Sequence, residues 1–210
     1  MRQQTGIIIL AAGTSARMGK PKQLLRYQGC SLIRRITQAA INGQLHPVLV
    51  VLGAWHELIA PEIKDFEVST VVNDEWQKGM GGSIKSGLKV LMDEWPEVTQ
   101  VILAVADQPY VTTELFGTMI LQRQLSGKGM IACTYSGVAG TPVLFDRKYF
   151  PALLNLAGEE GAKKILHQHA ADVALVPFEA GAIDIDTDAD YDQLISNSTN
   201  QGFKIDNDNS

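Results

Sequence analysis

Residues 6–25, GIIILAAGTSARMGKPKQLL, join a short apolar run to a loop that is rich in small residues and cations. The run from Gly6 to Ala12 has the continuous apolar pattern of a strand that is covered on both faces. In open α/β sheets, ligands bind beyond the carboxyl ends of the strands, where small residues let the main chain approach closely. This stretch therefore predicts a ligand site directly after the first strand.

The loop after this strand suits a ligand that carries phosphates. Ala11, Ala12 and Gly13 offer main-chain N–H and C=O groups, and three cations follow at Arg17, Lys20 and Lys22, with no acidic residue nearby. Guanidinium and ammonium groups neutralise phosphates in proteins. The alternative interpretation is an exposed basic turn without a ligand.

Two familiar phosphate-binding loops do not match this stretch. A P-loop has four residues between its glycines and a Ser or Thr after its Lys. Here five residues separate Gly13 from Gly19, and Pro21 follows Lys20. A dinucleotide-binding fingerprint is also missing, because no G-x-G-x-x-G follows the strand. The loop is of another kind.

Strand and helix patterns alternate through the first half of the chain, which predicts βαβ units and a mostly parallel sheet with helices on both faces. We expect one domain over residues 1–196 and a polar, disordered tail over 197–210. Further strands are predicted at 47–52, 66–72, 101–106, 129–135, 141–145, 173–176 and 182–185. Helices are predicted at 31–42, 55–63, 83–95, 112–125, 149–156 and 162–170, and from about Thr187.

Charge is unevenly distributed along the 210 residues, whose net charge is −5. Residues 1–56 carry seven cations and no acid, whereas the remainder carries 11 cations and 23 acids. This balance argues against a general nucleic-acid binder and suits a smaller polyanionic ligand. No apolar run is long enough to span a bilayer, and no signal-peptide pattern precedes the first strand. We expect a cytoplasmic protein without a membrane partner.

Motifs along residues 6–195 resemble those of the molybdenum cofactor cytidylyltransferases, within the nucleotidyltransferases that have a Rossmann-like fold. The opening stretch resembles L-A-A-G-x-S-x-R-M-G-x-x-K-x-L-L, and four further segments resemble G-M-x-x-S, D-Q-P, G-x-P-x-x-F and D-I-D-T. They occur here at Leu10–Leu25, Gly79–Ser83, Asp107–Pro109, Gly140–Phe145 and Asp184–Thr187. The resemblance implies a three-layer αβα fold with a mostly parallel, mixed sheet.

The resemblance also implies an activity, the Mg²⁺-dependent transfer of CMP from CTP to molybdopterin or its molybdenum-loaded form, with release of pyrophosphate. A molybdoenzyme or its chaperone would receive the product. Guanylyltransferases of this group usually have glycine where Ala12 stands, so Ala12 favours cytidine over a purine. The alternatives are another nucleotide such as GTP or ATP, another small phosphate acceptor, or a non-catalytic protein that binds the cofactor.

Each residue of the implied site has an expected role. Arg17 and Lys20 are candidates for the β- and γ-phosphates, and Lys22 for the α-phosphate, where charge builds toward the transition state. Arg17, Lys22 and Asp107 form the expected catalytic set. The nucleotide would contact Leu10, Ala11, Ala12, Gly13, Ser15, Arg17, Lys20, Lys22, Asn73, Gly79, Met80 and Ser83.

Three aspartates are the expected magnesium ligands, because Mg²⁺ needs hard oxygens and keeps several waters. Asp107 follows a buried strand, and Asp184 and Asp186 are two residues apart, so they share a face if that segment is a strand. For Asp184, the alternative that it only forms an ion pair or caps a turn is as well supported by the sequence as a role in metal binding. The family's G-D-x-G-A-R segment departs here to Gly158–Lys163, with Glu159 for Asp and Lys163 for Arg. If this segment touches the acceptor, the departure bears on the acceptor's identity.

Overall fold

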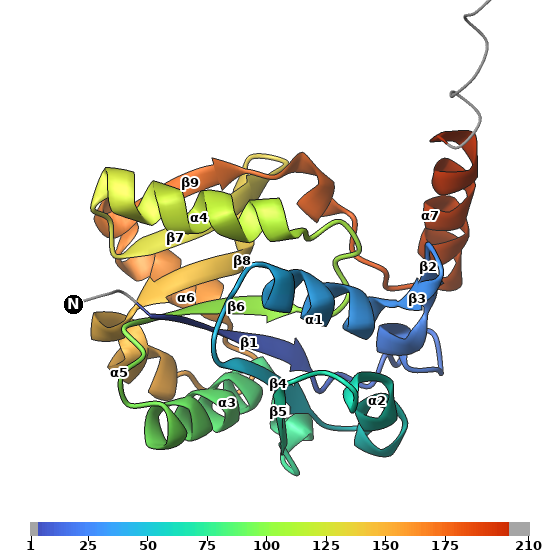
Figure 1. Cartoon of the computed structure of the whole chain (residues 1–210), viewed down its shortest axis with the longest axis horizontal. Coiled ribbons are helices and arrows are strands. Elements are labelled where there is room, and N and C mark those ends of the chain that lie inside the picture. Colours follow the sequence, from blue (N-terminus) through green and yellow to red (C-terminus); the bar gives the residue numbers. More distant parts are fainter. Residues whose placement is uncertain (1–3, 202–210) are drawn as a thin grey trace, which may run out of the picture.

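Seven strands form one sheet in the computed structural model, which describes residues 4–201 (Figure 1). Their spatial order is β5-β4-β1-β6-β8-β7-β9. The strands are β1 (Thr5–Ala11), β4 (Val48–Leu52), β5 (Ser69–Val72), β6 (Gln100–Val105), β7 (Met130–Tyr135), β8 (Val138–Asp146) and β9 (Val173–Pro177). Strand β8 is antiparallel to both neighbours, and every other pairing is parallel. The predicted mostly parallel, mixed sheet is confirmed.

Helices cover both faces of this sheet. They are α1 (Leu32–Asn42), α2 (His56–Ile63), α3 (Met80–Glu94), α4 (Thr113–Ser126), α5 (Phe150–Leu154), α6 (Ala162–Gln168) and α7 (Asp188–Gln201). Ile7 and Ile9 of β1 pack in one core cluster with side chains of α1, α2 and α4. Ile8 packs in the other cluster, with side chains of α3, α5 and α6. Because neighbouring strand residues point to opposite faces, these two clusters make the predicted three-layer αβα fold, with α1 and α4 opposite α3 and α5 in Figure 1.

The first strand brings the opening loop to one edge of the sheet. β1 pairs in parallel with β4 on one side and β6 on the other, so the carboxyl ends of all three strands meet. The strand residues are almost all buried, as expected for a sheet covered on both faces. The loop after Ala11 and the Asp107 segment after β6 therefore lie next to each other.

The predicted strand over residues 182–185 is wrong. Residues Glu179–Ala182 form a single 3₁₀ turn, and the segment that follows stays outside the sheet. Ile185 is fully buried, but in a small third cluster that includes Met18 and Leu25. Its amide donates to the carbonyl of Asp107, which ties the segment across the carboxyl ends of the strands. Burial of Ile185 against the opening loop replaces a sheet pairing.

The other differences concern element ends. Helix α3 begins at Met80, so the glycines before Ser83 form its first turn. Strand β5 begins only at Ser69. Ser31 precedes α1 as predicted, but its hydroxyl donates to the carboxylate of Glu62 and does not cap the helix. The ends of elements depend on tertiary partners more than their existence does.

The last helix packs on the opening loop. The predicted start near Thr187 is confirmed: its hydroxyl accepts from the amide of Asp190, whose carboxylate accepts from the amide of Thr187. Leu194 of α7 is buried with Met18 and Leu25, and Tyr191 donates to the carbonyl of Arg26 in the small hairpin of β2 (Arg26–Tyr27) and β3 (Cys30–Ser31). The predicted tail 197–210 begins inside α7, and its residues 202–210 lie outside the described residues.

None of the described helices combines the length and the apolar character that a membrane span requires.

Candidate active site

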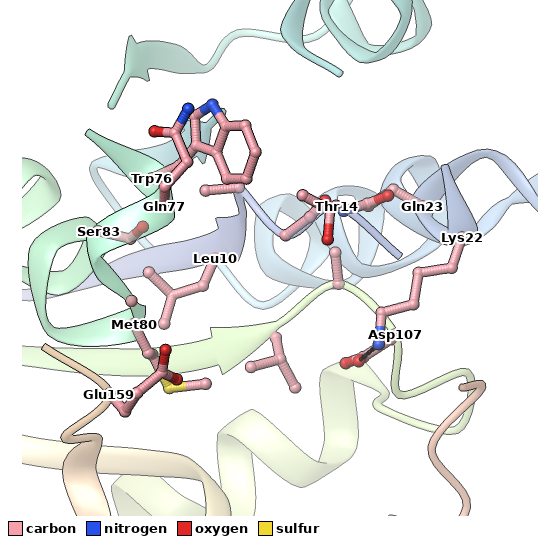
Figure 2. A pocket seen from close by; sticks show the side chains of 15 residues that line it. Leu10, Thr14, Lys22, Gln23, Trp76, Gln77, Met80, Ser83, Asp107 and Glu159 are labelled. Atoms are coloured by element: carbon pink, nitrogen blue, oxygen red, sulfur yellow. Dashed lines mark hydrogen bonds and ion pairs between the residues drawn. The ribbon is translucent and has the colours of Figure 1, made fainter. Parts of the chain in front are cut away.

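A cavity of about 370 Å³ opens at the carboxyl ends of β1 and β6. Figure 2 shows the opening loop on one side of it, the start of α3 on another, and Asp107 at its edge. The lining residues are Leu10, Ala12, Gly13, Thr14, Lys22, Gln23, Trp76, Gln77, Gly79, Met80, Ser83, Val105, Ala106, Asp107 and Glu159. The cavity lies where ligands of open α/β sheets bind.

The opening loop is held in place by side chains from neighbouring elements. Gln23 is 2% exposed, and its amide nitrogen donates to the carbonyls of Ala11 and Gly13 at 3.1 and 3.3 Å. The Trp55 ring nitrogen donates to the carbonyl of Thr14 at 2.8 Å. These bonds fix the main chain of residues 11–14 along the cavity wall.

Ser15 closes the same loop from within. Its hydroxyl accepts a hydrogen bond from the main-chain amide of Lys22 at 3.0 Å. Ser15 itself has a left-handed backbone, with φ of 54°. Its carbonyl accepts from the amides of Met18 and Gly19, which turns the chain back toward Lys22. Ser15 shapes the loop and does not line the cavity.

Lys22 lies between two of the predicted aspartates. Its ammonium group is 2.5 Å from a carboxylate oxygen of Asp107 and 2.9 Å from one of Asp186. The side chains of Lys22 and Asp107 are each 17% exposed, and in Figure 2 the ammonium group lies beside the Asp107 carboxylate. Burial lowers the pKa of Lys22, but the charges and hydrogen bonds of the two aspartates outweigh it, so the pKa is raised. Lys22 is a cation throughout the physiological pH range.

Arg17 and Lys20 lie outside the cavity lining. Arg17 is 3.0 Å from Asp186 and its side chain is 72% exposed; Lys20 is 2.7 Å from Asp188. The Lys22 hydrogen bond and the charges of Lys22 and Arg17 hold the pKa of Asp186 below its usual value. The three cations of the loop therefore lie along one acidic segment at the start of α7.

Asp184 lines a second pocket of about 440 Å³, whose lining also includes Asp107. Burial and the nearby carboxylates of Asp107 and Asp186 raise the pKa of Asp184 to about 6. The prediction that Asp184 and Asp186 share one strand face is wrong, because residues 183–186 do not form a strand. Asp186 contacts Lys22, whereas Asp184 lines the second pocket.

The start of α3 forms the far side of the cavity. Gly79 has a left-handed backbone with φ of 102°, and a Cβ there would lie 2.5 Å from the carbonyl oxygen of Gly158. The amide of Gly81 donates to that carbonyl at 3.0 Å. Only glycine fits this close approach. Loop 157–161 is thereby seated against the first turn of α3, and Glu159 reaches the cavity beside Met80 (Figure 2).

Ser83 and Asn73 are coupled to each other. The Asn73 amide donates to the Ser83 hydroxyl at 3.0 Å, and its carbonyl oxygen accepts from the amide of Glu75. Both residues are buried, and Ser83 lines the cavity while Asn73 stands behind it. Asn73 therefore orients Ser83 and ends β5 in a turn.

The matching family model is that of the MobA-like NTP transferase domain, and it covers residues 7–173. The chain belongs to this family. It is a nucleotidyltransferase of the MobA-like group, as the resemblance of its motifs predicted.

Two curated relatives match this MobA-like transferase over most of its length. It is 28% identical over 192 residues to nicotine blue oxidoreductase of Paenarthrobacter nicotinovorans, covering 86% of this chain and 91% of that protein. It is also 28% identical over 198 residues to the purine catabolism protein PucB of Bacillus subtilis, covering 89% and 94%. The names of these two relatives describe different activities.

Solved structures share the fold of this transferase. The homologue of Mycobacterium tuberculosis Rv0371c from Mycobacterium sp. strain JC1 is 25% identical, covers 96% of this chain and 100% of its own, and superposes with a TM-score of 0.82. Molybdopterin-guanine dinucleotide biosynthesis protein A from Archaeoglobus fulgidus superposes with a TM-score of 0.67 over 93% of this chain and 99% of its own. At 15% identity, the latter shows the fold alone.

The structure sorts the predicted nucleotide residues of this MobA-like transferase into two groups. Leu10, Ala12, Gly13, Lys22, Gly79, Met80 and Ser83 line the cavity. Ala11, Ser15, Arg17, Lys20 and Asn73 do not. Of this second group, Ala11, Ser15 and Asn73 hold lining residues in place.

Gln23 and Glu159 line the cavity, and the motifs did not assign either of them to the nucleotide. For Gln23, the one indication in the sequence was its position: it is a polar residue between Lys22 and two leucines that face the core. Glu159 belongs to a segment that departs from the family pattern, and no local signal indicated that it reaches this cavity. Only the seating of loop 157–161 on α3 brings it there.

Proposed function

We propose that this MobA-like nucleotidyltransferase moves CMP from CTP to the phosphate of a molybdopterin-type acceptor. An oxygen of the acceptor phosphate attacks the α-phosphorus, the bond from that phosphorus to the bridging oxygen of the β-phosphate breaks, and pyrophosphate leaves. Such a transfer needs alignment of two polyanions and neutralisation of their charge more than covalent help. The observation that carries the proposal is the Lys22 ammonium group, held between Asp107 and Asp186 at the cavity wall.

Lys22 is the proposed partner of the α-phosphate. A preorganised cation placed where charge develops stabilises the transition state more than the ground state. The two aspartates hold the ammonium group in position, so little reorganisation is needed when the nucleotide arrives. Arg17 and Lys20, at the open side of the same loop, are proposed to bind the β- and γ-phosphates by exchanging an aspartate for a phosphate.

Asp107 and Asp186 fit a hydrated Mg²⁺. Lys22 contacts one oxygen of each carboxylate, and the second oxygen of Asp107 is buried without a hydrogen-bond partner among the described residues, so this oxygen is open to an ion. No three His, Cys, Asp or Glu side chains of the described residues gather into a full metal cage. One or two carboxylates are what Mg²⁺ uses when phosphates and water complete its shell. When bound, the ion would supply charge neutralisation on the triphosphate.

Ala12 is proposed to favour cytosine over a purine. It is buried at the cavity wall, and the chain folds tightly against Gly53, where an added Cβ would lie 2.6 Å from the Ala12 carbonyl oxygen. The Ala12 methyl group therefore cannot move away from the cavity to make room for a larger base. Ser83 and the first turn of α3 are the proposed contacts of the base and ribose.

Pyrophosphate release with CTP, GTP and ATP, each with molybdopterin and Mg²⁺, tests this function. CTP should give the highest kcat/KM, and release should require both the pterin and the metal. A higher kcat/KM with GTP or ATP would refute the assignment of cytidine. Pterin binding without any pyrophosphate release would favour the non-catalytic cofactor-binding protein.

An Asp107→Asn variant tests the site itself. We expect turnover to fall about 10²-fold or more, as when a charged transition-state contact is lost. Asp188→Asn is the matched control, because Asp188 pairs with Lys20 on the surface and does not line the cavity. Equal activity of both variants would remove Asp107 from its role. A cytoplasmic location and a molybdoenzyme or chaperone as receiver complete the proposal.

A further inference from the structure

Three pockets follow one another from the carboxyl ends of the strands to helix α6. The nucleotide cavity shares Leu10, Met80, Val105, Asp107 and Glu159 with the second pocket. The second pocket shares Lys163 with a third pocket of about 230 Å³ between α6, β8 and β9. Lys163 thus lies at the end of the second pocket that is remote from the nucleotide.

The lining of the second pocket is mostly acidic, although the proposed acceptor carries a phosphate. Its lining holds three carboxyl groups, of Asp107, Glu159 and Asp184, and Lys163 is its single Lys or Arg residue. No described carboxylate lies within ion-pair distance of Lys163, whereas its neighbour Lys164 is 2.6 Å from Glu160. Lys163 is therefore a cation without an ion-pair partner among the described residues, in a pocket that is otherwise acidic.

The third pocket adds an apolar surface beyond Lys163. Ala139, Leu166, Val173 and Leu175 line it, together with His167 and the small Ala170. Leu175 is half exposed although it lies on a strand. A small sugar phosphate would end before this surface, whereas a larger ring compound would reach it.

We propose that Lys163 is a specificity-determining residue for the acceptor, and this inference rests on the proposed transfer function. Lys163 donates to a carbonyl, carboxylate or other anionic group on the acceptor's ring system, which is distinct from the phosphate that attacks. The ring system spans the second pocket, and its far edge rests on the apolar surface at Leu166 and Val173. The acceptor class is thus a phosphate monoester of a bulky ring compound that carries such a group, and not a small sugar phosphate.

Lysine footprinting on the wild-type protein tests the contact without any substitution. Reductive methylation of Lys163, followed by mass spectrometry, should be slowed by molybdopterin and unchanged by CTP alone. Lys164 is the internal control, and its reaction rate should not change. Protection of Lys163 by CTP alone, or equal protection of both lysines, would overturn the inference.

Steady-state kinetics of Lys163→Ala and Lys163→Arg give the second test. The alanine variant should raise the KM for molybdopterin about tenfold or more, as expected for one lost charged hydrogen bond, with kcat and the KM for CTP unchanged. Arginine should restore most of the loss, and Lys164→Ala should behave as wild type. With ribose 5-phosphate as acceptor, all variants should be equally poor. An unchanged KM for molybdopterin in the alanine variant contradicts the proposal.

The two proposals fail in different ways. If the wild-type protein releases no pyrophosphate from CTP, the transfer function falls, while protection of Lys163 by molybdopterin still supports the contact. If pyrophosphate is released but Lys163 is not protected, the transfer function stands and the role of Lys163 is wrong. If neither pyrophosphate release nor protection of Lys163 is observed, both proposals are overturned.

Discussion

Replacing Lys22 with methionine separates the two roles of this side chain. Methionine keeps the length and most of the packing of the lysine but removes its charge. Lys22 contacts Asp107 at 2.5 Å and Asp186 at 2.9 Å, and the loss of its charge leaves both carboxylates without that partner. Asp186 is nearly half exposed and can rehydrate. Most of the lost unfolding free energy therefore comes from Asp107, whose side chain is 17% exposed.

We expect this variant to lose about 2 kcal/mol of unfolding free energy, as when a buried polar group loses its partner. Turnover should fall by about 10²- to 10³-fold, equivalent to about 3–4 kcal/mol of transition-state stabilisation. Urea unfolding and pyrophosphate release from CTP measure the two effects. The KM for CTP should change less than kcat, because the contact strengthens as charge builds on the α-phosphate.

A second substitution distinguishes charge balance from catalysis. In the double variant Lys22→Met/Asp107→Asn, the unpaired carboxylate is gone, so stability should return toward that of wild type while turnover stays low. Lys20→Met is the control for stability, because this half-exposed side chain pairs with Asp188 outside the cavity and its loss should leave the free energy of unfolding close to that of wild type. A Lys22→Met enzyme with kcat close to that of wild type would refute the reasoning.

Three further substitutions probe the scaffold. Lys148 holds the pKa of Asp172 well below its usual value by a hydrogen bond, so this carboxylate stabilises the fold above pH 4 and loses that effect as the pH falls. At pH 7, Asp172→Asn should lower the free energy of unfolding by about 2 kcal/mol. Because the variant lacks this carboxylate, its free energy of unfolding should depend less on pH than that of wild type between about pH 5 and 2. Urea unfolding at several pH values measures this, and the same pH dependence in both proteins would contradict it. Leu194→Ala, at a side chain 1% exposed, should cost about 3 kcal/mol by urea unfolding, and a loss below 1 kcal/mol would show that α7 is not firmly packed. Gly53→Ala would place a Cβ 2.6 Å from the Ala12 carbonyl oxygen, so it should cost about 2 kcal/mol and weaken CTP binding by calorimetry, whereas unchanged affinity would mean that the loop adapts.

Local patterns in the sequence were sufficient for the layers of the fold. Buried strands such as β1 and β4 are continuous apolar runs, and a run covered on both faces requires helices on both sides. Small residues and cations after β1 indicated the candidate site, because the carboxyl edge of such a sheet is where side chains from several strands converge. Lys22 and Asp107 were predicted in this way, and their ion pair joins the segments that follow two adjacent strands.

Only the tertiary structure decided which side chains meet from distant segments. Residues 182–185 have an apolar pattern that fits a strand, but Ile185 is buried against Met18 and Leu25, and this contact brings Asp186 to Lys22. Likewise, a backbone contact between Gly79 and Gly158 delivers Glu159 to the cavity. Periodicity and local propensity act over a few residues, whereas these contacts join residues about 80 and 165 positions apart. The sequence by itself therefore determined the sheet and the edge at which the candidate site lies, and packing across the chain determined the second wall of that site.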